Sequence, residues 1–299
     1  MSDTVAVLAL DAADFRLARR WDCDNILLDD HRELETFSHS LSFPRTVEVW
    51  PTVATGLPPQ EHGNSGDSND WVNPVLKGLS TVSQYLPRRT RSILGQPFRR
   101  LGQEKTIRQI DVDHVFDNGA VRYWPGLTEA DHLLDAWKLT SALSSGESTE
   151  REVERTLKSF TGEEFGWLAV ASQFDVPVVG VHSHVLDIAG HVYCNREKEL
   201  RRMYEWVDVE IGRLRQRVGR LILLSDHGMQ VNFLDDSDPG THSFDALIAA
   251  QGLPKPLPDS VYDVREYIET NATTPQETDD EDGTLDTPTE HLEALGYIE

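Results

Sequence analysis

The chain has 299 residues, with 51 acidic and 28 basic side chains, which gives a formal net charge of −23 at pH 7. This length is enough for one large domain, or for one domain with an insertion. So acidic a chain repels a nucleic-acid backbone, and we expect no stable nucleic-acid complex. No apolar run approaches the length that spans a bilayer, so we expect no membrane segment either.

Acidic residues occur throughout the chain, and their mutual repulsion is screened at high salt. We therefore expect a salt-adapted protein from a halophile, the alternative being an acidic mesophilic protein with a disordered tail. The first residues lack the features of a signal peptide, and the two cysteines, Cys23 and Cys194, suit a reducing compartment. These features predict a cytoplasmic protein, while the oligomeric state leaves no mark on the sequence.

Apolar runs of strand length alternate with amphipathic segments. Residues 5–10, 25–29, 176–181 and 220–224 predict strands, and residues 127–144, 150–160, 163–174 and 195–217 predict helices. A further helix lies between residues 46 and 57, where Pro51 implies either a start at the proline or an irregular first turn. This alternation predicts an α/β protein, a three-layer α/β/α sandwich with a mostly parallel central sheet.

Residues 1–269 are expected to form one domain, with a small cap or insertion at about residues 65–175. Residues 270–289 have the composition of an acidic linker that need not fold, and residues 290–299 predict a short C-terminal helix. A basic cluster stands out near residues 88–108: Arg88, Arg89, Arg91, Arg99, Arg100, Lys105 and Arg108. It either collects an anionic substrate or, as we favour, is a solvated face that pairs with acidic neighbours.

Carboxylates and imidazoles gather at the predicted strand ends. Asp187 and His191 are spaced i, i+4, which places both side chains on one face of a helical turn. Asp11 directly follows one expected strand, the Asp226–His227 pair lies at the end of another after Ser225, and His242 lies in a turn-like segment. Three carboxylates and three imidazoles can hold two divalent ions, for which zinc is favoured and manganese is the alternative.

Thr46 lies where a helix is expected to begin. Backbone N–H groups and the helix dipole gather anionic charge at such a position, which suits both a phosphate and an alkoxide nucleophile. The alternative is an ordinary N-cap, for which threonine is a preferred residue.

Taken in order, these residues resemble the alkaline phosphatase superfamily, and most closely its type I phosphodiesterase/nucleotide pyrophosphatase branch. The resemblance covers about residues 5–65 and 180–245, including Thr55-Gly56 and His62-Gly63. It implies an alkaline phosphatase-like fold in which Thr46 is the nucleophile and forms a phospho-threonine intermediate. It also implies one metal held by Asp11, Asp226 and His227 and contacting Thr46, and a second held by Asp187, His191 and His242.

The chain departs from the branch in two places. Val-Glu-Val-Trp follows Thr46 in place of a proline-containing turn, and Glu48 brings a charge close to the nucleophile. Where pyrophosphatases carry an asparagine that contacts the phosphoryl group, this chain has Asp67, with Asn64 and Asn69 as nearby substitutes.

The resemblance favours a phosphodiesterase or nucleotide pyrophosphatase that acts on a small phosphoester. A phosphomonoesterase or a phosphomutase on the same core stays open, and so does a metal-stabilised binding protein without turnover. A sulfatase is excluded because Thr46 cannot supply the aldehyde that those enzymes form from Cys or Ser. His182 and His184 are expected to be structural, although one of them near the second metal could meet the substrate.

Overall fold

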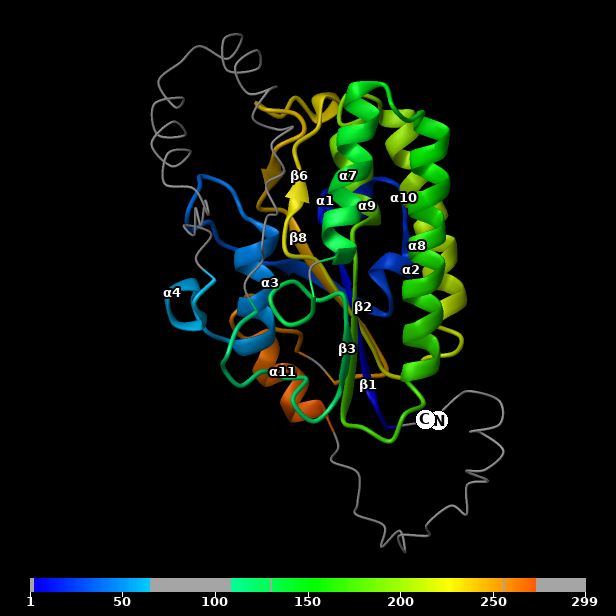
Figure 1. Ribbon diagram of the computed structural model, residues 1–299. Helices are drawn as coiled ribbons and strands as arrows, with labels where there is room; N and C mark the ends of the chain where they lie inside the picture. The colour runs from blue at the N-terminus through cyan, green and yellow to red at the C-terminus, as the bar shows by residue number, and fades with distance from the viewer. Residues whose placement is uncertain (1–2, 65–108, 130, 255, 273–299) are drawn as a thin grey trace, which may run out of the picture.

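The computed structural model describes residues 3–64, 109–129, 131–254 and 256–272 (Figure 1). Its centre is a six-stranded sheet in the order β2-β8-β5-β1-β4-β3. The strands are β1 (Val5–Leu10), β2 (Asp30–Leu34), β3 (Ala120–Arg122), β4 (Val178–Ser183), β5 (Leu221–Leu224) and β8 (Ala246–Gln251). β8 runs antiparallel to its neighbours β5 and β2, so the other strands all share one direction. The sheet is mostly parallel, as predicted.

Helices cover both faces of this sheet and give the three expected layers (Figure 1). One face carries α1 (Phe15–Arg20), α2 (Asp24–Leu27), α8 (Glu150–Ala171), α9 (Val185–Tyr193) and α10 (Glu197–Leu214), and α7 (Asp131–Ser145) packs on α8 and α9. The other face carries α3 (Thr46–Thr55) and α11 (Val264–Asn271), with α4 (Pro59–His62) beside α3. Outside the main sheet, β6 (Gly228–Met229) pairs with β7 (His242–Ser243), and Asn232–Leu234 forms a 3-10 turn.

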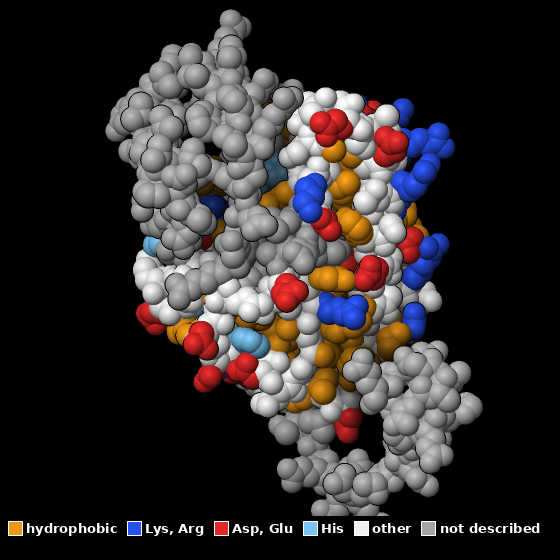
Figure 2. Space-filling view, in the orientation of Figure 1, with side chains coloured by type: hydrophobic (Ala, Val, Ile, Leu, Met, Phe, Trp, Pro, Cys, Tyr) orange, Lys and Arg blue, Asp and Glu red, His pale blue; other side chains and the backbone are white. Residues whose placement is uncertain are grey.

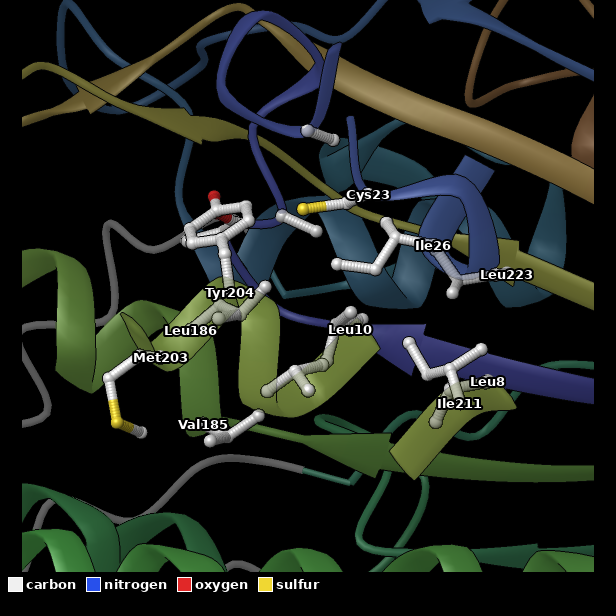
Figure 3. Close-up of a cluster of buried hydrophobic side chains, with 14 of the residues drawn as sticks. Leu8, Leu10, Cys23, Ile26, Val185, Leu186, Met203, Tyr204, Ile211 and Leu223 are labelled. Atoms are coloured by element: carbon white, nitrogen blue, oxygen red, sulfur yellow. The ribbon is translucent and has the colours of Figure 1, made fainter. Parts of the chain in front are cut away.

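Alternation along each strand divides the core in two. On β1, Leu8 and Leu10 face α2, α9 and α10, whereas Val7 and Ala9 face α3 and α11. Figure 3 shows the first of these clusters, in which Leu10 lies among side chains of the helical layer. Because every residue of β1 is fully buried, its sequence is a continuous apolar run, as is usual for a central strand of a parallel sheet.

The predicted strand at residues 25–29 is wrong, because this segment forms α2 and the strand begins at Asp30. Asp208 of α10 explains the difference. Its Oδ1 accepts the backbone N–H groups of Asn25 and Ile26 at 2.8 and 3.0 Å, which satisfies the free end of a short helix. This contact comes from far along the chain and leaves no local trace in the sequence.

The helix that contains Thr46 matches neither of the two expected arrangements. α3 is helical from Thr46 to Thr55 and has Pro51 in its interior. The proline removes one N–H donor from the helix, but the burial of Trp50 and Val53 against the sheet stabilises the segment. The Pro51 carbonyl is used as well, because Thr55 Oγ1 donates to it at 2.7 Å.

Other boundaries also differ. The two helices expected at residues 150–160 and 163–174 are one helix, α8, which begins with a capping box between Thr149 and Glu152. Residues 120–122, 131–145 and 150–171 form β3, α7 and α8. The cap or insertion at about residues 65–175 stays a prediction. The basic cluster, Asn69 and the C-terminal helix lie outside the described residues, whereas Thr270 and Asn271 of the expected linker end α11. Among the described helices, none has the length and apolar character needed to cross a membrane.

Candidate functional site

The candidate site lies at the carboxyl ends of the three central strands. β1 lies between β5 and β4, so Asp11, the Asp226–His227 pair and His184 leave neighbouring strands at the same edge. This is where open α/β sheets bind their ligands. The backbone N–H of Asp11 donates to the Ser183 carbonyl at 3.0 Å, which ties two of these strand ends together.

The first cluster consists of Asp11, Asp226 and His227, all fully buried. His227 Nε2 lies 3.2 Å from Asp11 Oδ1 and 3.3 Å from Asp226 Oδ2. The first residue of α3 reaches this cluster, because Thr46 Oγ1 lies 3.3 Å from Asp11 Oδ2 and 3.5 Å from His227 Nε2. The structure thus brings Thr46 together with the three residues expected to hold the nearer metal.

The second cluster consists of Asp187, His191 and His242. α9 places Asp187 and His191 one turn apart, and His191 Nε2 lies 3.2 Å from Asp187 Oδ1. His242, from β7, brings its Nε2 to 3.6 Å from the same oxygen. Its ring stacks on that of His227 at a centroid separation of 3.7 Å, so the two clusters adjoin.

The outer ring nitrogens of these histidines are held by backbone carbonyls. His191 Nδ1 contacts Gly240 O at 3.0 Å, His242 Nδ1 contacts Pro44 O at 2.8 Å, and His227 Nδ1 contacts Gly228 O at 2.9 Å. A carbonyl accepts only from a protonated nitrogen, so in each neutral ring Nε2 is the atom left to act as ligand. This pattern is typical of histidines that bind metals.

The carboxylates of both clusters fit divalent cations. Asp226 Oδ2 and Asp187 Oδ1 are buried and have no hydrogen bond, which is costly for a carboxylate unless a cation neutralises it. The mixture of imidazole and carboxylate ligands suits zinc or manganese. The residues present therefore fit a pair of metal sites.

The ionisation of the site reflects this crowding. Burial and the nearby Asp11 charge raise the pKa of Asp226 well above its ordinary range. Burial also acts on Asp11, but hydrogen bonds from imidazoles outweigh it and lower the pKa of that group. The pKa of His227 rises to about 10 because its carboxylate neighbours outweigh burial, whereas burial and the His227 charge lower the pKa of His242 to about 4.

A network that the sequence did not reveal joins the loops that carry these groups. Asp14 caps α1 through Leu17 N, and its Oδ2 accepts from Arg16 and from Met229 N, just beyond His227. A side chain at Gly228 would come within 2.5 Å of this oxygen, which explains the glycine at that position. Only the sequence Asp226-His227-Gly228 hinted at this close approach.

Tyr204 of α10 supports the same loop after β1. Its hydroxyl accepts the backbone N–H of Asp14 at 2.9 Å and donates to Ala12 O at 3.3 Å. A tyrosine in a long amphipathic helix carries no signal of such a role.

His182 and His184, expected to be structural, both contact Asp11. His184 Nδ1 lies 2.9 Å and His182 Nε2 lies 3.3 Å from Asp11 Oδ2. They therefore adjoin the first cluster.

The structure also shows the surroundings of Glu48 and Asn64, two residues at which the chain departs from the family pattern. The Glu48 carboxylate lies against Ser40 and Arg45, with Arg45 Nη1 at 3.4 Å, so its charge is paired. The side chain of Asn64 lies beside Gly126, and its backbone N–H donates to His62 Nδ1 at 3.2 Å. His62 in turn contacts Thr52 Oγ1 at 3.1 Å and so joins α4 to α3.

Comparison with protein families assigns the chain to a family. The family model for type I phosphodiesterase / nucleotide pyrophosphatase matches residues 5–274, which is most of the chain. The chain belongs to this family. It is accordingly a metal-dependent phosphoester hydrolase, and the family acts on small phosphoester substrates. None of the curated protein sequences matches the chain.

Several solved structures are partly similar to the chain. Alkaline phosphatase from the Antarctic bacterium TAB5 has a TM-score of 0.45 and 11% identity, covering 90% of this chain and 97% of that one. A variant of that enzyme with magnesium bound has a TM-score of 0.47 at the same identity and coverage. Murine ectonucleotide pyrophosphatase/phosphodiesterase 5 has a TM-score of 0.37 and 16% identity, covering 76% and 57%. Similarity at this level assigns no residue role.

Proposed function

We propose that the chain is a phosphodiesterase or nucleotide pyrophosphatase in which Thr46 is the nucleophile. The observation that carries this proposal is the position of Thr46 Oγ1, between Asp11 Oδ2 at 3.3 Å and His227 Nε2 at 3.5 Å. The hydroxyl thus touches the first cluster and lies at the beginning of α3. If Thr46 were only an N-cap residue, its hydroxyl would need neither Asp11 nor His227 beside it.

The surroundings of Thr46 suit attack on phosphorus. The N–H groups of Thr46 and Val47, the first two of α3, have no preceding helical turn to accept them, and together with the helix dipole they favour the anionic oxygens of a phosphoryl group. Thr46 Oγ1 would form a bond to phosphorus as the leaving alcohol departs, and the proton lost by Thr46 balances the one that the alcohol gains. Water then hydrolyses the phospho-threonine intermediate and restores the hydroxyl.

Two divalent cations complete this proposal. Asp11, Asp226 and His227 would hold one, next to Thr46, and Asp187, His191 and His242 would hold the other. Zinc or manganese at these positions would lower the pKa of the Thr46 hydroxyl and stabilise the charge on the attacking and leaving oxygens. Asn64 and Asn69 stay proposed contacts of the phosphoryl group.

The test is hydrolysis of bis-p-nitrophenyl phosphate against p-nitrophenyl phosphate, in high KCl with zinc or manganese added. We expect a clear preference for the diester. A preference for the monoester would replace the proposal with a phosphatase. If neither substrate turns over while both cations are bound, the outcome would favour a phosphomutase or a binding role.

We also propose a cytoplasmic, salt-adapted protein. Cys23 and Cys194 are both free thiols, as suits a reducing compartment. On the face shown in Figure 2, acidic side chains are scattered over the described surface. Such a distribution matches the excess of acidic residues along the whole sequence.

A further inference from the structure

The two oxygens of Asp11 face different groups. Oδ1 lies 3.2 Å from His227 Nε2 and so faces the first cluster. Oδ2 lies 2.9 Å from His184 Nδ1 and 3.3 Å from His182 Nε2. All four side chains are buried, so bulk water does not compete for either oxygen. Oδ1 is thus directed to His227 of the candidate metal site, whereas Oδ2 lies between the pair of histidines and the Thr46 hydroxyl, which is 3.3 Å away.

The contact between His184 and Asp11 differs in kind from those within the clusters. His184 Nδ1 and Asp11 Oδ2 form a hydrogen bond of 2.9 Å. By contrast, Asp226 Oδ2 and Asp187 Oδ1 make no hydrogen bond, although imidazole nitrogens lie 3.2–3.3 Å away. These cluster nitrogens therefore lie close to the two carboxylate oxygens without forming hydrogen bonds of good geometry, as ligands of a shared cation do. The ring of His184 instead donates to the carboxylate.

The position of His184 is fixed by its place in the fold. It is the residue between β4 and α9, and its backbone carbonyl accepts Ile188 N at 3.1 Å in the first turn of α9. His182 lies edge-on to its ring at a centroid distance of 4.2 Å, and Trp50 lies edge-on to His182 at 5.2 Å. Packed rings on a strand end leave His184 little freedom to turn away from Asp11.

We propose that His184 is a positioning residue for Asp11. Its Nδ1–H holds Oδ2 and so turns Oδ1 toward the first cluster, where Asp11 would bind a cation through one oxygen. His182 packs against the ring and contacts the same Oδ2. This inference rests on the proposed function, because it assumes a cation at the first cluster. Hydrogen bonds that orient a ligand typically change metal affinity by about 10–100-fold.

Two substitutions distinguish the effect of losing the hydrogen bond to Asp11 from the effect of replacing the imidazole ring. In His184→Asn the side-chain amide takes the place of Nδ1 and can still donate to Asp11. In His184→Gln the amide reaches the place of Nε2 instead, so the polarity is kept and the donor is misplaced. His31→Leu, on the edge strand β2, removes an imidazole away from the site and serves as control.

The experiment measures manganese binding to the metal-free full chain by titration calorimetry, with circular dichroism as a check of folding. Asp226→Ala and Asp187→Ala identify which binding step belongs to which cluster. We expect His184→Gln to weaken the first-cluster step by about 10–100-fold. The second-cluster step should be unchanged, and His184→Asn and His31→Leu should stay within a few-fold of the original chain.

Several results would overturn the positioning role. Equal weakening of both steps in His184→Gln would indicate general damage, and unchanged binding would show that the hydrogen bond is not used. A third equivalent of manganese, lost in His184→Asn, would make Asp11, His182 and His184 a cation site of their own. Should His184→Gln not fold, weak first-cluster binding by His184→Asn would still refute the role. If the unsubstituted chain bound no manganese at the first cluster, the proposed function itself would fail, which is a distinct outcome.

Discussion

Glu164 allows a sharp test of how burial controls ionisation in this fold. It lies on α8, which packs against β4, and only 1% of its surface is exposed. Burial raises the pKa of its carboxyl group from 4.5 to about 8, while an interaction with Ser183 offsets only part of that effect. The charged form is therefore disfavoured in the folded chain.

The effect on stability follows from the two pKa values. Between about pH 4.5 and pH 8 the unfolded chain ionises Glu164 while the folded chain keeps it protonated, so stability falls as pH rises. Below this window Glu164 is protonated in both the folded and the unfolded chain, so it has no effect on stability. Above the window it is charged in both, and the loss of stability has reached its limit. The folded and unfolded pKa values differ by about 3.5, and each pKa unit corresponds to about 1.4 kcal/mol. The full loss of stability across this window is therefore roughly 5 kcal/mol.

Glu164→Gln removes the ionisable group and keeps its shape. Urea unfolding at constant salt should show little change in the free energy of unfolding at pH 5. At pH 9 the variant should be more stable than the original chain, with a gain on the order of 3–5 kcal/mol.

Glu163→Gln is the matched control for this measurement. Glu163 is the adjacent residue, its side chain is 56% exposed, and the substitution removes the same charge from the chain. The Glu163 charge is the smallest of the three causes that shift the Glu164 pKa, so this variant should reduce the pH dependence only slightly. If both variants changed that dependence equally, net charge rather than burial would be the cause, and the reasoning would be refuted.

Three further outcomes are expected. Tyr204→Phe leaves Ala12 O and Asp14 N–H without their partner and should lower the free energy of unfolding by about 1–3 kcal/mol, measured in urea; an unchanged value would remove Tyr204 from the support of the loop after β1. Chelation of the divalent cations should abolish hydrolysis and lower Tm, because it leaves buried carboxylates uncompensated. Added zinc or manganese should restore both hydrolysis and Tm. Activity that survives exhaustive chelation would argue against a role for the cations. Raising KCl should increase Tm by screening the net charge of −23, whereas sorbitol at equal osmolarity should not match it, and equal effects of the two would exclude screening.

The layered fold was predictable because its central strands have continuous apolar sequences. β1, β4 and β5 are buried on both faces, so each was visible as a short apolar run followed by a polar residue. Asp11 follows such a run directly, and Asp226 follows another after Ser225. The order of these residues along the chain therefore predicted which groups would meet at one edge of the sheet.

Features that depend on contacts between distant segments were not predictable. The segment that forms α2 was predicted to be a strand. Its helical form depends on hydrogen bonds from Asp208, which lies far along the chain and could not be inferred from the local sequence. The hydrogen bond between His184 and Asp11 likewise joins residues 173 positions apart. Pro51 within α3 breaks a local rule, which the burial of the helix overrides.

The role of Thr46 is tested most directly by the turnover of bis-p-nitrophenyl phosphate by Thr46→Ala, with metal content measured on the same sample. Thr55→Ala, at the other end of α3, controls for the loss of a threonine from that helix. We predict that Thr46→Ala retains both cations and loses at least about 10³-fold in kcat, while Thr55→Ala stays active. Turnover by Thr46→Ala within about tenfold of the original chain, with both cations bound, would contradict the assignment of Thr46 as the nucleophile.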